Sequence, residues 1–399
     1  MKQRKLMILG ASTAQLPIIC KAVELGHYVI TVDNQPNNIG HQFSQQCVNC
    51  STVDQDGVLA VAQALAIDGI VTFASDVATV PVAFVAEEMG LFGCKVRNAE
   101  TLSNKANFRV FQQAHQLNHP SFCISERIDL SDIHRCGLTP PLIFKPVDTS
   151  GSRGITKVDA LNNDICAQAF AYAQRFSRSG LVSIEAFIAG VDVSGDGFLV
   201  DGQLCAIVTQ KYKCGFIPTG HSLPTDLSHE DQQRIFAEIT KTCLALGYLN
   251  GPIDFDVKLL DECVVVIEMS PRLGGNGIPE LIRRGTGIDL IEMTVQYALG
   301  SPCLLPDALV VNRCCGSWVF GSEHAGTLDF ITPVDTLREH IPELFEYRFN
   351  YQIGDEVLDF EHSGNSLGYA LFDCPLDADY NSMVERLRTA MQLRVITDA

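Results

Sequence analysis

Charged side chains are scarce in this sequence of 399 residues, in which Asp, Glu, Lys and Arg together make up only 19%. Apolar residues make up 46%, which is enough for a sizeable core. This balance excludes a disordered chain and does not fit a coiled coil. The length exceeds that of one ordinary domain and predicts two or three domains.

Basic runs and long apolar stretches are also missing. Beyond the start at Lys2–Lys5 no segment is rich in Lys or Arg, and the formal net charge is −18. A field of this sign repels nucleic acid and anionic membranes, although a single site can still be locally basic. No uninterrupted apolar stretch reaches about 18 residues. We therefore expect no transmembrane helix, no membrane partner and no nucleic-acid partner.

The sequence has no recognisable disulfide framework. Its 15 cysteines are scattered without a repeating spacing, which favours reduced thiols in a cytoplasmic protein. Cys47 and Cys50 form one isolated pair, and no second pair completes the four ligands of a zinc site. The apolar stretch that ends at Cys20 mimics a signal peptide, but Gln15 and Pro17 interrupt it. We expect a cytoplasmic location.

The first hundred residues alternate between strands and helices. This alternation predicts a parallel sheet that is flanked by helices. Buried apolar runs predict the strands, and 3.6-residue periodicity predicts the helices. The expected elements span residues 6–9, 14–25, 28–32, 69–73 and 77–89.

Ligands of parallel sheets lie beyond the carboxyl ends of the strands, where this sequence places several polar residues. Gly10–Thr13, Asp33 and the pair Ser75 and Asp76 are expected along that edge. The G-x-G-x-x-G fingerprint of dinucleotide sites is absent, because Gly10 is followed by Ala11 and a run without further glycine. An NAD or FAD site is therefore not expected, and Asp33 can be read as a residue that caps a strand end.

Beyond residue 100 the pattern changes to a mixture of strand pairs and helices. Asp201-Gly202 is typical of a hairpin turn, and Asp261-Glu262 separates two apolar strands that we expect to pair antiparallel. The last hundred residues suggest a small α+β unit. The expected helices span 101–120, with Ser103-Asn104 as a candidate cap, and 160–176, 230–247 and 377–392. The expected strands span 142–147, 155–158, 181–188, 252–260, 263–269 and 367–372.

A loop of small residues follows the strand that ends at Lys145-Pro146. A loop rich in Gly and Ser can fold over a triphosphate and donate backbone N–H groups, and Lys145 would place a positive charge on phosphate. The loop includes Ser150, Gly151 and Ser152. A plain hairpin loop is the alternative interpretation.

An apolar strand with an acid near each end follows, over Glu185–Asp192. An adenine ring needs a flat apolar slot with a few hydrogen bonds from a strand backbone, and a ribose needs a nearby acceptor. Ala186, Phe187 and Ile188 would line such a slot. The alternative is an ordinary strand with solvated acids.

Asp256 and Glu268 fall on the two strands of the expected antiparallel pair. Facing acids on neighbouring strands repel one another unless a cation lies between them. Mg²⁺ binds a few carboxylate oxygens together with phosphate oxygens, so the pair predicts a metal site. Asp254 falls on the same face as Asp256, as an outer ligand or a plain surface acid.

The second of these strands runs into Ser270-Pro271-Arg272-Leu273-Gly274-Gly275. Arg272 is placed to neutralise charge on a transferring phosphoryl group, and the glycines allow the backbone to approach a ligand closely. A strand end that enters a glycine-rich turn is the alternative.

These four patterns, in this order, resemble the ATP-grasp superfamily, in the branch that contains biotin carboxylase, carbamoyl phosphate synthetase halves, purine-pathway ligases and L-amino-acid ligases. The likeness runs from about residue 1 to 300. It implies a Rossmann-like domain over 1–103, an ATP-grasp domain over 104–300 with a mobile lid at about 120–190, and a small C-terminal α+β domain over 301–399. The fold class is thus α/β and α+β multidomain.

The resemblance also implies roles for the residues of these motifs. Lys105 and Lys145 would bind ATP phosphates under the glycine-rich loop, Glu185 would serve the adenine hinge, and Asp192 would bind the ribose. The implied cofactors are ATP and Mg²⁺ or Mn²⁺. Two departures are Ser270, where the family usually has Asn, and Asp192, which is one carbon shorter than the usual Glu. The implied metal ligands and catalytic residues are Asp256, Glu268, Ser270, Arg272 and Lys145.

The family chemistry implies a ligase that activates a small carboxylate as an acyl phosphate and passes it to an amine or another nucleophile. Both substrates would be small molecules, and a homodimer would be in keeping with relatives. A carboxylase or carbamoyl-phosphate type of enzyme that uses bicarbonate is one alternative, and a non-catalytic ATP-binding regulatory protein is another. Candidate substrate residues are Ser75, Asp76, Lys211, Lys213, His221, Arg283 and Arg284.

Overall fold

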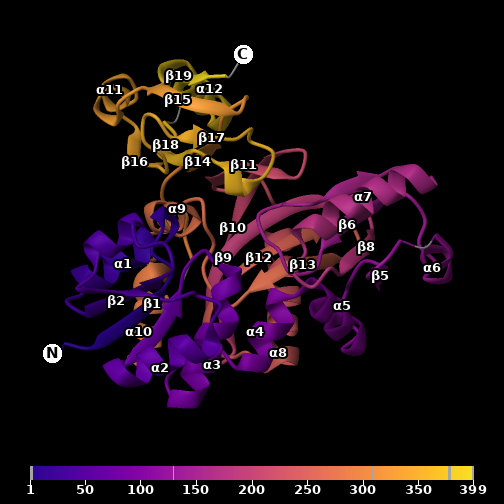
Figure 1. The fold of residues 1–399 in the computed structure, drawn as a ribbon, viewed down its shortest axis with the longest axis horizontal. Coiled ribbons are helices and arrows are strands. Elements are labelled where there is room, and N and C mark those ends of the chain that lie inside the picture. The colour runs from indigo at the N-terminus through magenta and orange to yellow at the C-terminus, as the bar shows by residue number, and fades with distance from the viewer. Residues whose placement is uncertain (1–2, 129, 307–308, 376–378, 398–399) are drawn as a thin grey trace.

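The computed structural model describes residues 3–128, 130–306, 309–375 and 379–397, and its elements form four sheets (Figure 1). The chain begins in a four-stranded sheet with the order β3-β2-β1-β4, in which all pairs are parallel. The parallel sheet expected from the alternation is therefore present. Its elements are β1 (Lys5–Leu9), η1 (Thr13–Gln15), α1 (Leu16–Glu24), β2 (Tyr28–Asp33), η2 (Ile39–Phe43), β3 (Gln46–Asn49), α2 (Gln55–Leu65), β4 (Gly69–Thr72), η3 (Asp76–Ala78) and α3 (Thr79–Met89).

Asp33 organises the carboxyl edge of this sheet. Its Oδ2 accepts a hydrogen bond from the backbone N–H of Ala11 at 2.9 Å, and its Oδ1 accepts one from Gln35 at 2.9 Å. The carboxylate thus ties the loop after β1 to the loop after β2. This geometry agrees with the reading of Asp33 as a capping residue.

Two helices occupy the region in which a helix was expected over 101–120 with a cap at Ser103-Asn104. Asn104 is extended, with φ −123°, and its side chain accepts hydrogen bonds from the backbone of Ala106 and Asn107. Such a cap begins a new helix and satisfies its first N–H groups. The cap expected at Asn104 is therefore confirmed, but the helix that it begins ends at Ala114 and not at residue 120, and the residues up to Ser103 belong to a separate helix. The two helices are α4 (Val96–Ser103) and α5 (Lys105–Ala114).

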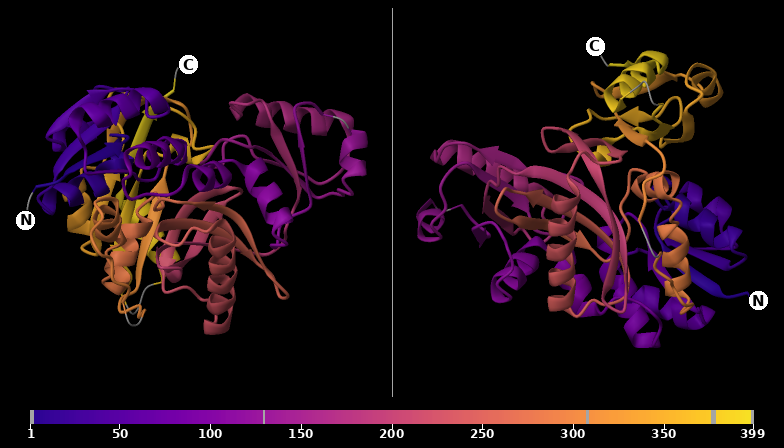
Figure 2. Two further views of the ribbon diagram at one scale, coloured as in Figure 1. Left: turned by 90° about the horizontal axis from the view of Figure 1, so that it is seen from below. Right: turned by 180° about the vertical axis from the view of Figure 1, so that it is seen from behind.

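A small sheet with the order β5-β8-β6-β7 extends to one side of the molecule (Figure 2). Its apolar side chains pack with those of α7 around Phe144 and Phe170. Its strands and helices are β5 (Phe122–Ser125), α6 (Leu130–Arg135), β6 (Leu142–Pro146), β7 (Thr156–Val158), α7 (Asn163–Phe176) and β8 (Val182–Ala186).

The centre of the molecule is an eight-stranded sheet with the order β13-β12-β9-β10-β11-β14-β18-β16, in which all pairs are antiparallel. The turn between β9 and β10 is the expected Asp201-Gly202 hairpin, and both residues have positive φ, 49° and 80°. The expected pairing of the strands after Gly251 is also confirmed. The strands are β9 (Val191–Val200), β10 (Gln203–Cys214), β11 (Ile217–Leu223), β12 (Gly251–Leu259), β13 (Val264–Ser270), β14 (Cys315–Phe320), β16 (Leu344–Phe349) and β18 (Gly368–Asp373).

The two faces of the central sheet differ because side chains alternate along each strand. Ile253, Phe255 and Val257 of β12 lie in an apolar core that includes Ile235 and Ile239 of α8 (His229–Leu246). The opposite face carries polar side chains at every second position. These polar positions are Asp192, Ser194 and Asp196 of β9, Thr209, Lys211 and Lys213 of β10, and Asp254, Asp256 and Lys258 of β12.

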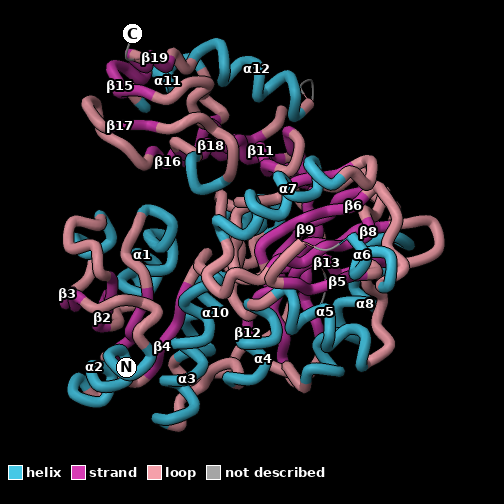
Figure 3. Tube along the Cα trace, turned by 45° about the vertical axis from the view of Figure 1, so that its right-hand side comes forward, coloured by secondary structure: helices cyan, strands magenta, loops and turns pink. Residues whose placement is uncertain are grey.

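The last part of the chain joins the central sheet through β14, β16 and β18 and adds a three-stranded sheet, β17-β15-β19, at the top of the view in Figure 3. Within the described ranges, no helix is long and apolar enough to cross a membrane. The remaining elements are α9 (Ile278–Thr286), α10 (Leu290–Ala298), β15 (Gly326–Ile331), α11 (Val334–His340), β17 (Glu356–Val357), η4 (Ser363–Asn365), α12 (Tyr380–Ala390) and β19 (Leu393–Ile396).

Candidate active site

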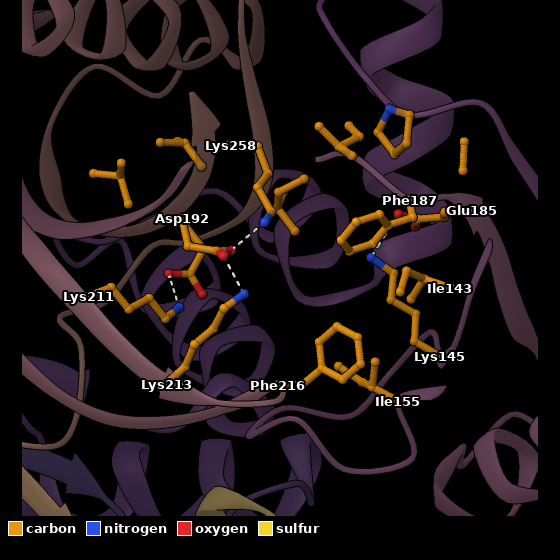
Figure 4. A pocket seen from close by; sticks show the side chains of 17 residues that line it. Ile143, Lys145, Ile155, Glu185, Phe187, Asp192, Lys211, Lys213, Phe216 and Lys258 are labelled. Carbon is orange, nitrogen blue, oxygen red and sulfur yellow. Dashed lines mark hydrogen bonds and ion pairs between the residues drawn. The ribbon is translucent and has the colours of Figure 1, made fainter. Parts of the chain in front are cut away.

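A pocket lies between the outlying sheet, at β6 and β8, and the polar face of the central sheet (Figure 4). The space between these two surfaces amounts to about 680 Å³, part of which is open solvent. It is lined by Pro120, Ile143, Lys145, Ile155, Glu185, Ala186, Phe187, Ile188, Asp192, Val193, Lys211, Lys213, Phe216, Asp256, Val257, Lys258 and Ile267.

One end of the pocket is apolar. The aromatic rings of Phe187 and Phe216 lie there together with the side chains of Ile143 and Ile155 (Figure 4). Lys258 Nζ lies 5.7 Å from the centre of the Phe187 ring. Flat apolar walls beside charged groups suit an aromatic base that is attached to a polar tail.

Glu185 lies between two cations at the side of the pocket. Its Oε2 is 2.9 Å from Lys145 Nζ, and its Oε1 is 3.1 Å from Arg109 Nε. Glu185 and Lys145 are 3% and 4% exposed, and Arg109 is fully buried, so solvent screens these charges little. The three groups carry one net positive charge, which favours an anion next to them.

The pKa values of this trio reflect the balance of burial and charge. Burial alone would raise the pKa of Glu185, but Arg109 and Lys145 overcome it and lower the pKa to about 2. Burial lowers the pKa of Lys145 to about 8. Repulsion from Arg109 and Lys105 adds to this lowering, and the attraction of Glu185 only partly opposes it. Glu185 is therefore ionised at neutral pH, and Lys145 begins to lose its proton only slightly above it.

Asp192 is held by two lysines at the start of β9. Lys258 Nζ lies 2.8 Å from its Oδ1, and Lys213 Nζ pairs with its Oδ2. All three side chains line the pocket. The carboxylate expected to accept hydrogen bonds from a ribose is thus present, and it is currently engaged in ion pairs.

Asp256 and Glu268 stand directly opposite one another in the β12–β13 pair. Each carboxylate is held by its own lysine, with Lys211 Nζ 2.7 Å from Asp256 Oδ1 and Lys105 Nζ 3.1 Å from Glu268 Oε1. Burial opposes ionisation of Asp256, but Lys211 lowers its pKa below the usual value. Both carboxylates are therefore matched by positive charge in this structure.

The donor set at this position fits Mg²⁺ only together with a ligand. No group of three or more His, Cys, Asp or Glu side chains suited to a metal occurs in the described part of the chain. Mg²⁺ is commonly held by one or two carboxylates, with water and phosphate oxygens as the other ligands. Asp256 and Glu268 supply those two carboxylates, whereas the hydroxyl of Ser270 donates to Asp76 Oδ1 at 2.8 Å.

Arg272 is surrounded by carboxylates from η3, which follows the N-terminal sheet, and from the central sheet. Its Nε donates to Asp76 Oδ1 at 2.9 Å, and its Nη1 pairs with Asp254. Asp196 lies close by and accepts a hydrogen bond from the backbone of Gly274 at 2.9 Å. The guanidinium group therefore joins the N-terminal sheet to the central sheet and is oriented before any ligand binds.

The pKa values of the three acids around Arg272 are shifted in different directions. Burial opposes ionisation of Asp76, but Arg272 lowers its pKa. Burial raises the pKa of Asp254 to about 6 against the attraction of Arg272. Burial and the neighbouring Asp254 raise the pKa of Asp196 well above its usual value. Three buried carboxylates beside one guanidinium cannot all ionise cheaply, so the cluster retains a proton.

The loop of small residues after β6 contacts both the central sheet and the C-terminal part. The backbone N–H of Ser363 donates to Gly151 O at 3.1 Å, and the hydroxyl of Ser152 donates to Phe216 O at 2.7 Å. Gly151 has φ +73°, a conformation that favours glycine. Ser150 precedes this turn, and Ser150 O accepts a hydrogen bond from Arg153 at 3.1 Å.

The candidate substrate residues are not gathered in one place. His221 is buried, its Nδ1 is 2.9 Å from Thr209 Oγ1, and burial together with Lys211 lowers its pKa to about 3, so the ring is neutral. Ser75 precedes η3, which contains Asp76. Arg283 is half exposed and lies 3.7 Å from Asp289, and Arg284 pairs with Asp373, so neither lines the pocket.

Three residues of the candidate active site were not identified from the sequence. Lys258 could have been found, because it continues the period-two row of Asp254 and Asp256 along β12. Arg109 lies within the segment that resembles the ATP-grasp family, but its role was not predicted. Its partner Glu185 is 76 positions away in the sequence, and no local pattern connects the two residues. Phe216 lies in the turn between β10 and β11, and no spacing in the sequence connects it with the pocket.

Comparison with known proteins agrees with this geometry. Residues 138–280 match the family described as the ATP-grasp domain, and the match covers β6, the loop after it, β8–β13 and the start of α9. The chain contains an ATP-grasp domain. The matched segment holds Lys145, Glu185, Asp256 and Arg272, which occupy the pocket and the arginine cluster next to it.

Similar proteins include several ligases. The ATP-grasp chain is 23% identical to human carnosine synthase 1 over 375 residues, covering 85% of this chain and 45% of that protein. It is 25% identical to alanine–anticapsin ligase of Bacillus subtilis over 287 residues, covering 65% and 60% of the two chains. The chain thus spans about half the length of the first curated relatives it matches.

A similar solved structure is that of an L-amino acid ligase from Bacillus licheniformis, with a TM-score of 0.83. That likeness covers 100% of both chains at 21% identity. A likeness at this level of identity establishes the fold. The multidomain α/β and α+β architecture implied by the resemblance is therefore confirmed.

Proposed function

We propose that this ATP-grasp protein is an ADP-forming carboxylate–amine ligase that uses Mg-ATP. The observation that carries the proposal is the pair of facing carboxylates, Asp256 and Glu268, each held by a lysine at the polar end of a flat apolar pocket. When Mg-ATP binds, the lysines can pair with phosphate oxygens, and the carboxylates are then released to face the metal ion.

The base and ribose of ATP would occupy the pocket. Phe187 and Phe216 would flank the base, with the backbone of Ala186 and Ile188 at its edge, and Asp192 would accept hydrogen bonds from the ribose. Glu185 supports this site by holding Lys145 in place. Lys145 and Lys105, with the backbone of Ser150, Gly151 and Ser152, would hold the phosphates.

Asp256 and Glu268 would hold the divalent cation, Mg²⁺ or Mn²⁺, with Ser270 two residue pairs further along the same strands. When bound, that ion offsets the negative charge of the phosphate oxygens. Lys211 would leave Asp256 for a phosphate oxygen, so that the carboxylate can face the ion.

Arg272 would stabilise the phosphoryl group during transfer. An oxygen of the substrate carboxylate attacks the γ-phosphorus, the bond to ADP breaks, and an acyl phosphate forms. The amine then attacks the acyl carbon, loses a proton, and releases phosphate. Asp76 and Asp254 keep the guanidinium oriented, so little reorganisation is needed when charge develops.

The substrate class is inferred from the chemistry of the site and from the names of similar proteins. Carnosine synthase, alanine–anticapsin ligase and an L-amino acid ligase are each named for ligase or synthase reactions. We infer an amino acid or a similar small carboxylate as substrate.

We further propose a domain division at 1–103, 104–300 and 301–399, with the outlying sheet as the lid. A homodimer and a cytoplasmic location also remain predictions.

The test is phosphate release from Mg-ATP by the full chain with pools of amino acids and small carboxylates, with Glu268→Ala as the blank. Stimulation by one pool, with ADP as the nucleotide product, is expected. Formation of AMP and pyrophosphate would overturn the acyl-phosphate mechanism. ATP binding without stimulation by any pool or by bicarbonate would favour a non-catalytic role, and stimulation by bicarbonate alone would favour a carboxylase type.

A further inference from the structure

A second charged site lies where the C-terminal strands meet α9. Glu280, in the first turn of α9, is 8% exposed, and its Oε1 accepts a hydrogen bond from the hydroxyl of Tyr369 at 3.2 Å. Arg348 on β16 is the direct cross-strand neighbour of Tyr369 on β18. Gly277, with φ +78°, allows this approach, because a Cβ there would lie 2.9 Å from the Tyr369 ring.

Glu280 and Arg348 carry opposite charges and influence one another, but among the described residues no hydrogen bond connects them. Glu280 Oε2 and Arg348 Nε are both buried, and neither has a hydrogen-bond partner among the described residues. Each nevertheless acts on the ionisation of the other: Arg348 opposes the effect of burial, which raises the pKa of Glu280. Buried polar atoms of a folded protein are almost always paired, so Arg348 Nε lacks an acceptor and Glu280 Oε2 lacks a donor that a ligand could supply.

The guanidinium group has capacity for a ligand. Glu346 Oε1 lies 2.9 Å from Arg348 Nε, outside the geometry of a hydrogen bond. Among the described residues, no hydrogen bond from the two terminal nitrogens of Arg348 is found, and the side chain is 26% exposed. Glu280 is thus the buried charged group of the site, and Arg348 is the partly exposed one.

We propose that Arg348 and Glu280 bind the carboxylate and the ammonium group of an amino acid, and that this amino acid is the amine-supplying substrate. The assignment rests on the proposed ligase function. A carboxylate held by the fork of a guanidinium is not free to attack phosphate, so the molecule bound here is the acceptor and not the activated acid. The ammonium group would satisfy Glu280 Oε2, and Tyr369 keeps the other oxygen in place.

The site is continuous with the phosphoryl-transfer residues. The chain runs from Arg272 through Gly274-Gly275-Asn276-Gly277 directly into the first turn of α9, which carries Glu280. Burial raises the pKa of the Cys20 thiol on α1, and the charges of Arg348 and Glu346 also act on this pKa. The N-terminal part therefore borders the site as well. An acceptor bound between these three parts of the chain would lie beside the loop that follows Arg272.

The experiment is a binding measurement on the full chain saturated with MgADP. The probes are the standard L-amino acids in a thermal-shift screen, followed by calorimetry with the best binder, its deaminated acid and its decarboxylated amine. The variants are Arg348→Gln and Glu280→Gln. The matched controls are Arg338→Gln and Glu385→Gln, which change exposed residues of α11 and α12.

Both site variants should weaken amino-acid binding by roughly tenfold or more, because each loses a charged hydrogen bond, while MgADP affinity and the controls stay unchanged. The decarboxylated amine should bind wild type and Arg348→Gln equally. Equal amino-acid affinity in wild type and both variants would mean a structural water only and would overturn the proposal. Binding of MgADP without any amino acid would refute the amino-acid class alone, whereas failure to bind MgADP would refute the ligase function.

Discussion

Asp256 faces Glu268 directly across the β12–β13 pair, yet each carboxylate is held by a lysine from a different strand or helix. Two facing acids repel one another, and each lysine offsets one negative charge. In the structure the lysines hold the acids. Under the proposed function the lysines would instead hold phosphates, and the acids would hold a cation, with a similar balance of charge.

Replacing Glu268 by Gln should remove metal-dependent turnover while the fold is kept. The amide is nearly isosteric, but it leaves the cation with one carboxylate, so we expect kcat to fall by roughly 100-fold or more. Steady-state phosphate release over a range of Mg²⁺ concentrations measures this. Glu262→Gln, an exposed acid in the β12–β13 turn, is the matched control. Full activity of Glu268→Gln would remove Glu268 from the metal site.

Replacing Arg109 by Met should destabilise the protein, because Glu185 would keep a buried charge with only Lys145 to balance it. Breaking a buried pair by removing one partner costs about 3 kcal/mol. Urea unfolding monitored by circular dichroism measures the change. The double variant Arg109→Met/Glu185→Gln should recover part of the loss. If the single variant is as stable as wild type, the trio does not contribute to stability as described.

ATP affinity should fall as the pH rises through about 8. Burial lowers the pKa of Lys145 to about 8, so the side chain is charged below that pH and becomes neutral above it. A neutral amine attracts phosphate much less, and the dissociation constant for ATP should therefore increase with pH in the wild type. The Lys145→Met variant should bind weakly at every pH with a flatter profile, whereas the exposed control Lys241→Met should behave as wild type. Parallel profiles for wild type and Lys145→Met would show that another group causes the pH dependence.

Arg272→Lys should separate chemistry from nucleotide binding. Lysine keeps the charge among Asp76, Asp254 and Asp196 but loses the planar fork that contacts two of them at once. We expect kcat to fall by roughly 100-fold with little change in ATP affinity. Single-turnover phosphate release and equilibrium nucleotide titration measure the two quantities. An equal loss in both would place Arg272 in nucleotide binding instead.

Periodicity and local motifs accounted for much of the architecture. The alternation of 6–9, 28–32 and 69–73 with helices predicted the parallel sheet, and Asp201-Gly202 predicted the β9–β10 hairpin. The cap expected at Asn104 is present, but the helix expected over 101–120 ends at Ala114, and a separate helix precedes the cap. Capping side chains act on two or three backbone groups and leave the surrounding periodicity unchanged.

The sequence by itself determined which residues share a face of a strand, because side chains alternate along a strand whatever packs against it. The row Asp254, Asp256 and Lys258 follows from this rule alone. Only the tertiary structure decided which charges meet across the chain. The contact of Asp76 with Arg272 spans 196 positions, and the unjoined pair Glu280 and Arg348 belongs to parts of the chain with no shared local pattern. Such contacts depend on how whole sheets and helices pack together, and that packing is set by the summed apolar surface of many residues and not by the spacing of the charged ones.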